Sequence, residues 1–202
     1  MMKINRSPVP DWLRDNWEQW GQEYVEKLQQ NPRYQFNWKQ IQGEKVNHKL
    51  LPLLSEMTNH HCSFCDSFPL GKGVIKPTIE HFKPKSRSKF PALAYQWENL
   101  FIACSYCQEK GDAFDDRLLK PDEVYYKFEH FFLFNFRTFE IEARKDNAIS
   151  NSDKQRAEIT LKMYKINGSD RPQSRARELT IFNKITPAER NINDFSYRYM
   201  FH

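Results

Sequence analysis

The four cysteines of the chain are the residues whose spacing points most directly to chemistry. They form two C-x-x-C knuckles, Cys62 with Cys65 and Cys104 with Cys107. Two intervening residues let one tight turn direct both thiolates at the same ion, and four thiolates complete the tetrahedral coordination of zinc. The pattern therefore predicts one structural Zn²⁺ site. The alternative is that the two pairs are unrelated redox or core cysteines.

Two histidines lie directly beside the first knuckle, at His60 and His61. Histidine is a common zinc ligand, so either could bind the ion in principle. Because the cysteines already fill a tetrahedron, we expect both histidines to be exposed residues that flank the site.

A second group of polar residues lies in the segment between the knuckles. Glu80 and His81 are adjacent there, and Asn99 follows shortly before the second knuckle. An unperturbed imidazole titrates near ~6.5, so His81 can take a proton from water. Neighbours on a strand point to opposite faces unless a bulge or a strand end redirects one of them. The alternative roles are a surface His81 paired with Glu80, and Asn99 as a turn or strand-edge residue.

The order of these motifs resembles the HNH endonuclease family in its zinc-stapled form, over about residues 62–112. The resemblance implies a ββα-metal core in which a hairpin carries an acidic residue and a histidine and a short helix follows. It implies that His81 is the general base and that Asn99 ties the loop to the hairpin. Lys110, just beyond the second knuckle, is expected to pair with the phosphate.

Two positions depart from the family pattern. Glu80 stands where many members have Asp, and Gln108 stands where His or Asn is usual. The resemblance implies that Glu80 and Gln108 hold a catalytic Mg²⁺ or Mn²⁺, for which oxygen ligands are suited. The alternative is that Gln108 faces away and that a nearby acid, Asp112 or Glu109, supplies the ligand. The extra methylene of Gln108 changes the geometry, so we expect weak activity in Mg²⁺ that rises in Mn²⁺.

Segments outside this core are similar to a narrower group, the HNH components of prokaryotic anti-phage defence systems of the Septu and retron-linked types. The similar stretches are residues 3–6, 61–65, 156–158 and 165–168. In those systems an ATPase partners the nuclease. The resemblance therefore implies an ATPase partner protein for this chain.

Basic side chains are concentrated just after His81. They are Lys83, Lys85, Arg87 and Lys89. Next to a hydrolytic site such a run predicts an edge that follows nucleic-acid phosphates, whereas elsewhere it is often a solvated loop. The net charge of +5 is compatible with a nucleic-acid partner, with DNA expected and RNA possible.

Periodicity and turn residues outline the elements that must position these groups. We expect helices over 11–29 and 44–58, the second interrupted or kinked by Pro52, and short strands over 74–82 and 100–103. A hairpin is expected over residues 128–143. Two helices should follow, one from Asp153 to Ile166 and one that begins at Ser169-Asp170 and turns Ala176, Leu179 and Phe182 inward.

These elements predict an α+β, mainly helical fold, and the resemblance implies that the chain surrounds a small ββα-metal core stapled by zinc. Its expected parts are an N-terminal helical segment (1–60), the nuclease core (61–116), and a C-terminal hairpin plus helices that pack on the core (117–202). With 39% hydrophobic and 28% charged residues the composition is globular.

The sequence also argues against several classes of protein. It has no apolar run near the roughly 20 residues of a membrane span, no signal peptide in residues 1–11 and no glycine-rich nucleotide loop. We therefore expect a cytoplasmic protein without a membrane partner, and the resemblance implies that it is a metal-dependent nuclease. The alternatives are a catalytically weak, zinc-stapled nucleic-acid-binding module, and a scaffold that bridges partners through its aromatic N-terminal helix.

Overall fold

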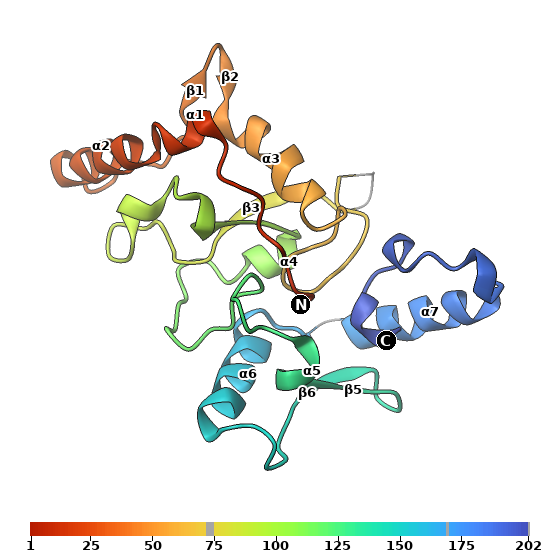
Figure 1. The fold of residues 1–202 in the computed structure, drawn as a ribbon. Helices are drawn as coiled ribbons and strands as arrows, with labels where there is room; N and C mark the ends of the chain where they lie inside the picture. Colours follow the sequence, from red (N-terminus) through yellow and green to blue (C-terminus); the bar gives the residue numbers. More distant parts are fainter. Residues whose placement is uncertain (72–74, 169, 202) are drawn as a thin grey trace.

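The structure, a computed structural model, describes residues 1–71, 75–168 and 170–201. Its fold is mixed α+β, as predicted: the described residues form seven α-helices and three small antiparallel sheets of two strands each (Figure 1). No helix in these residues has the length and apolar character needed to cross a membrane.

The N-terminal part contains two helices, a short hairpin and a third helix. They are α1 (Asp11–Arg14), α2 (Trp17–Gln30), β1 (Gln40–Ile41), β2 (Glu44–Lys45) and α3 (Val46–Glu56). The helix expected over 11–29 is thus divided by a turn between α1 and α2. Helix α3 continues through Pro52, and its buried face carries Leu50 and Leu54.

A ββα unit lies at the centre of the molecule (Figure 1). Strand β3 (Thr78–His81) pairs antiparallel with β4 (Leu100–Ala103), and helix α4 (Ser105–Gln108) packs against β3. The expected strand began at Val74, which lies outside the described residues. Between the two strands the chain makes two 3₁₀ turns, Pro91–Leu93 and Trp97–Asn99.

The C-terminal part is a hairpin with helices on either side of it in sequence. Its elements are α5 (Phe128–Phe131), β5 (Phe132–Asn135), β6 (Glu140–Ala143), α6 (Asn151–Met163) and α7 (Arg171–Lys184). Three 3₁₀ turns follow, at Pro187–Glu189, Ile192–Asp194 and Arg198–Met200. Ser169, expected to begin the last helix, lies outside the described residues.

Helix α7 buries charged residues where apolar ones were expected. Ala176, Leu179 and Phe182 are only half-buried, whereas Arg171 and Arg175 are buried. The Arg175 guanidinium is 0% exposed and donates hydrogen bonds to two main-chain carbonyls, an amide oxygen and a tyrosine hydroxyl. A buried arginine with this many acceptors satisfies its donors, so it can lie in a core.

Arg6 holds residues 1–10, which precede α1, against the ββα unit. The guanidinium lies 4.4 Å from the ring centroid of Phe101, in β4, and its Nε donates to Asp122 at 2.6 Å. Nη1 of Arg6 also donates to the carbonyl oxygen of Trp97 at 2.8 Å. Residues from all three segments expected from the sequence therefore contribute to one buried core.

Candidate metal centre and active site

The four cysteine sulfurs converge at one point beside the ββα unit. The Sγ atoms of Cys62, Cys65, Cys104 and Cys107 all lie within 4.8 Å of one another, and all four residues are buried. Zn–S bonds of about 2.3 Å in a tetrahedron place sulfurs about 3.8 Å apart, and Cys65 and Cys104 are separated by 3.6 Å. The predicted convergence of the knuckles is confirmed, and the four cysteines are positioned to hold a metal ion.

Hydrogen-bond donors surround the sulfurs, one of them a cation. The Arg171 guanidinium at the start of α7 donates to the Sγ of Cys107 at 3.3 Å and lies 3.9 Å from that of Cys104. The main-chain N–H of Cys104 donates to the Sγ of Cys62 at 3.4 Å. Burial alone would lower the pKa of Arg171, but the cysteine sulfurs outweigh burial and the pKa is raised. The donor set therefore fits a tetrathiolate metal centre, with one arginine compensating its charge.

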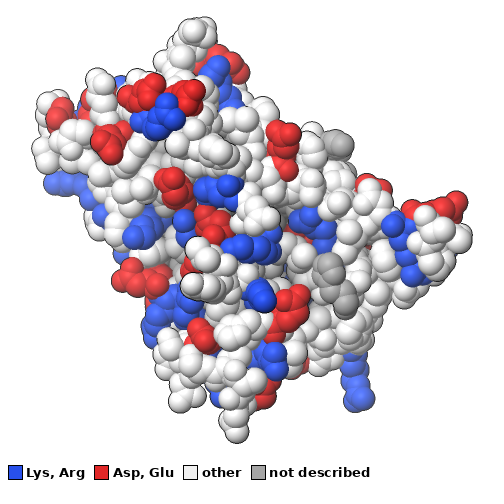
Figure 2. Space-filling view, viewed as in Figure 1, with Lys and Arg blue, Asp and Glu red and all other residues white. Residues whose placement is uncertain are grey.

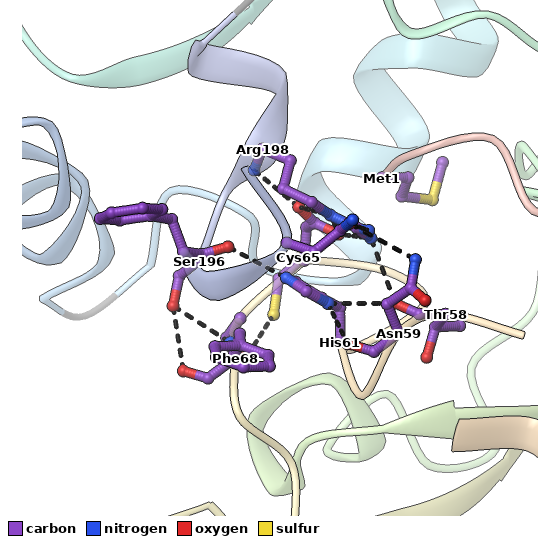
Figure 3. Close-up of polar contacts among 12 residues, drawn as sticks. Met1, Thr58, Asn59, His61, Cys65, Phe68, Ser196 and Arg198 are labelled. Carbon is purple, nitrogen blue, oxygen red and sulfur yellow. Dashed lines mark hydrogen bonds and ion pairs between the residues drawn. The ribbon is translucent and has the colours of Figure 1, made fainter. Parts of the chain in front are cut away.

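The C-terminal segment, residues 195–198, contacts the first knuckle and the residues that follow it (Figure 3). Arg198 forms a buried ion pair with Asp66, Nη2 to Oδ1 at 2.7 Å, and its main-chain N–H donates to Asp66 Oδ2. The Ser196 hydroxyl bonds both the N–H and the carbonyl of Phe68 at 3.1 Å. The residues just after Cys65 are thus held by a segment more than a hundred positions later in the sequence.

The expectation that His61 is exposed is wrong. Its ring is fully buried, Nε2 lies 3.0 Å from the carbonyl oxygen of Phe195, and the ring stacks on Phe68 at 4.6 Å (Figure 3). Nδ1 faces the carbonyls of Thr58 and Asn59 at 3.0 and 2.6 Å. Both ring nitrogens face main-chain oxygens, so His61 joins the first knuckle to the C-terminal segment. His60 is exposed, as predicted.

His81 lies at the end of β3, and only one of its ring nitrogens has a hydrogen-bond partner among the described residues. Its Nε2 is 2.9 Å from the carbonyl oxygen of Ala94; a carbonyl only accepts, so Nε2 carries the hydrogen and Nδ1 is the basic atom. Burial lowers the pKa of His81 to about 3, and the nearby Lys85 ammonium acts in the same direction. The ring is therefore neutral near pH 7, and in this environment it is a weak base. An anion in front of it would raise its pKa and make it a stronger base.

Aromatic residues from the N-terminal part hold the His81 ring in place. Trp38 stacks on it at 5.7 Å with an interplanar angle of 22°, and Phe36 meets it edge-on at 5.7 Å. Sequence reasoning missed both because they lie outside the motif. The dense aromatic composition of residues 34–38 was the one available signal.

A small pocket of about 170 Å³ opens beside His81. Its polar lining comes from four places in the chain: Asn47 in α3, Thr78 and His81 in β3, Lys85 in the loop after β3, and Gln108 in α4. Burial lowers the pKa of Lys85, whose ammonium lies 5.0 Å from the Phe36 ring centroid. The structure therefore brings together His81, Lys85 and Gln108 of the predicted site residues.

Glu80 points away from this pocket and forms an ion pair with Lys110. Lys110 Nζ lies 2.8 Å from Glu80 Oε1 and 3.3–3.4 Å from the carbonyl oxygens of His81, Phe82 and Ala113. Burial raises the pKa of Glu80 to about 7, against the lowering effect of Lys110.

This ion pair bears on two expectations. The Lys110 side chain is 0% exposed and bound to Glu80 in this structure, and its contact with a phosphate stays a prediction. Gln108 donates its Nε2 hydrogen to the carbonyl of Ile79 at 3.3 Å, while Glu80 is bound to an ammonium. The Glu80–Gln108 cation site is therefore not assembled here, and among the described residues the cysteines form the one cluster of potential ligands.

Asn99 joins the loop between the strands to the start of β4. Its Oδ1 accepts from the Lys83 N–H at 2.7 Å, and its Nδ2 donates to the carbonyls of Lys83 and Leu93, both at 3.0 Å. This loop carries Ala94, the acceptor of the His81 Nε2 hydrogen. Asn99 therefore fixes the loop that orients His81, while a part for it in catalysis stays a prediction.

The predicted basic edge separates into two pairs. Arg87 and Lys89 are exposed, whereas Lys83 and Lys85 are partly buried, with the Lys83 ammonium 5.2 Å from the Phe90 ring centroid. Positive and negative side chains are interspersed over the face of the molecule in Figure 2, so no field of one sign covers that face.

No family model matches the chain, and no curated protein matches it. The function is therefore argued from the site.

Proposed function

We propose that this chain is a metal-dependent HNH-type endonuclease that hydrolyses phosphodiester bonds in nucleic acid, with a structural zinc at the four cysteines. The observation that carries the proposal is His81, a neutral imidazole whose Nδ1 carries no hydrogen, on a ββα unit beside a pocket that also contains a lysine. The motif order over residues 62–112 supports the same class.

The proposed reaction uses residues already placed around the pocket. Nδ1 of His81 takes one proton from a water molecule, and the water oxygen bonds to phosphorus. The bond from phosphorus to the leaving sugar oxygen breaks, and that oxygen takes a proton from solvent. The products are one phosphate end and one hydroxyl end. Lys85 neutralises charge that develops on the phosphate.

The proposed divalent cofactor is Mg²⁺ or Mn²⁺, with Glu80 and Gln108 as candidate ligands. When bound, such an ion supplies further neutralisation of the phosphate charge. Binding through Glu80 requires the carboxylate to give up its ion pair with Lys110. This requirement and the long arm of Gln108 are two reasons to expect a weak response to Mg²⁺, because Mg²⁺ demands near-octahedral geometry.

A second candidate function has a specific observation in its favour. If Lys110 holds Glu80 permanently, the chain is a zinc-stapled nucleic-acid-binding module with little catalysis. The scaffold alternative loses support, because Trp20 and Tyr24 of the N-terminal aromatic stripe are buried in the core.

An ATPase partner in a prokaryotic defence system remains part of the proposal and rests on the resemblance. A partner of that kind needs a contact surface. Val124 and Tyr125 are 81% and 90% exposed, an adjacent apolar pair that supplies a candidate contact.

Cleavage of supercoiled plasmid tests the proposal against the binding module. We expect wild-type protein to nick plasmid in Mn²⁺ and more slowly in Mg²⁺, and not in EDTA. Two further measurements separate the catalytic ion from the structural one. One is the zinc content after EDTA treatment, and the other is the recovery of cutting when Mg²⁺ or Mn²⁺ is returned. Binding without cutting in either ion would select the second candidate, and single-stranded RNA in the same assay distinguishes the substrates.

The exposed basic pair should contact phosphates without reading bases. Each of Arg87→Ala and Lys89→Ala should weaken DNA binding to a similar extent on unrelated sequences. Each should also flatten the slope of log K against log salt by about 0.7–0.9 per lost contact. Fluorescence anisotropy over a salt series measures both quantities. Unchanged affinity and slope in both variants would mean that these side chains are only solvated.

A further inference from the structure

One polar atom in the pocket beside His81 lacks a partner. Oδ1 of Asn47 is buried and, within the described part of the chain, accepts no hydrogen bond. Buried amide oxygens are normally paired, because an unsatisfied acceptor lowers stability. Asn47 lines the same pocket as His81 and Lys85.

The position of Asn47 is set by elements that the motif does not include. It is the second residue of α3, which follows the β1–β2 hairpin, and α3 packs on both strands of the ββα unit. The helix buries Val46 and Leu50 on either side of Asn47 in sequence. The side chain is therefore presented to the pocket by a helix anchored in the core.

The pocket has the size and the polar groups to hold a water beside a phosphate. Its volume of about 170 Å³ exceeds the roughly 30 Å³ that a water molecule takes up in the liquid, so a water molecule fits in it. Its lining includes His81, whose Nδ1 carries no hydrogen, Asn47, whose Oδ1 accepts no hydrogen bond within the described residues, and the cationic Lys85.

We propose that Asn47 orients the nucleophilic water. The water gives one hydrogen to Nδ1 of His81, which removes it, and the other to Oδ1 of Asn47, which it keeps. With both hydrogens directed at protein acceptors, a lone pair of the oxygen faces the phosphate held by Lys85. This assignment rests on the proposed phosphodiester hydrolysis and adds a residue of the N-terminal segment to its site.

The test uses three variants of the full chain and the plasmid assay. Asn47→Leu keeps the size of the side chain but removes the acceptor, and Asn47→Asp keeps an acceptor of the same reach. His48→Ala changes the adjacent exposed residue and is the matched control. We expect Asn47→Leu to lower the single-turnover cutting rate about 10²-fold with DNA affinity unchanged, because the water is no longer aligned. Asn47→Asp should keep most of the rate, and His48→Ala all of it.

Thermal stability separates this role from a structural one. Asn47→Leu removes an unsatisfied acceptor, so its melting temperature should equal or exceed that of wild type. Two results would overturn the assignment while leaving the nuclease proposal in place. In the first, the Asn47→Leu variant cuts as fast as the His48→Ala variant. In the second, the Asn47→Asp variant cuts as slowly as the Asn47→Leu variant. Failure of wild-type protein itself to cut would overturn both.

Discussion

Cys104→Ser is expected to lose its metal and most of its folding stability. Serine is a poor zinc ligand at neutral pH, because the thiolate is what binds, so the site falls to three ligands. Structural zinc contributes about 10–16 kcal/mol in small zinc peptides, as much as the roughly 5–15 kcal/mol that stabilises a whole domain. The variant should therefore be largely unfolded at 37 °C.

Elemental analysis and thermal unfolding measure these effects together. Wild-type protein purified without chelator should contain one zinc per chain, and Cys104→Ser close to none. Ser105→Ala is the matched control, because Ser105 is the exposed neighbour of Cys104 at the start of α4. A disulfide between knuckle cysteines in wild-type protein, or a Cys104→Ser variant with normal zinc and stability, would exclude the metal centre.

The large effect expected from Cys104 follows from how much of the chain meets at this point. The two knuckles join the loop before β3 to the turn after β4. Arg171 connects α7 to the same sulfurs, and the ion pair between Asp66 and Arg198 connects the C-terminal segment to the first knuckle. Loss of the ion would leave the Arg171 guanidinium buried without its counter-charge, which adds to the cost. The metal centre thus connects three parts of the fold.

The elements around the knuckles could be predicted because local rules specify them. Thiolate spacing, the apolar run of β4 and the apolar positions 46, 50 and 54 of α3 each depend on a few residues near in sequence. Arg171 and Arg175 show where such rules fail. A hydrophobicity pattern treats them as surface residues, yet their i, i+4 spacing puts both on one face of α7, and sulfurs and carbonyls from distant segments satisfy them. That spacing was the only local signal.

The candidate site likewise contains residues that the sequence predicted and residues that it did not. His81 and Asn99 could be recognised from their order between the knuckles, whereas Asn47 and Trp38 come from a segment with no motif. The separation of Glu80 from Gln108 was also beyond sequence reasoning, since it depends on Lys110 filling the space beside Glu80. Strand alternation did favour opposite faces for Glu80 and His81, and that expectation agrees with their contacts.

His81→Gln is the sharpest test of the proposed chemistry. Alanine at this position would remove packing against Trp38 and leave the Ala94 carbonyl without its donor, so a loss of activity could reflect lost structure. Glutamine places an amide N–H near the position of Nε2 and can still donate to Ala94, but it has no basic nitrogen. We therefore expect cutting to fall by about 10²–10⁴-fold, the usual contribution of a general base, with zinc content and melting temperature close to wild type.

The pairing of His81→Gln with His81→Ala makes the result decisive. If His81 is the base, both variants lose cutting to a similar extent, although only the alanine variant is destabilised, by a cavity and an unsatisfied carbonyl. If His81 is structural, activity follows stability, so the glutamine variant cuts at nearly the wild-type rate and the alanine variant does not. Single-turnover cleavage and thermal unfolding of the two proteins distinguish these outcomes. The glutamine variant keeps the hydrogen bond to Ala94, as in wild type, and lacks only the basic nitrogen, so its activity reports on the basicity of the ring alone.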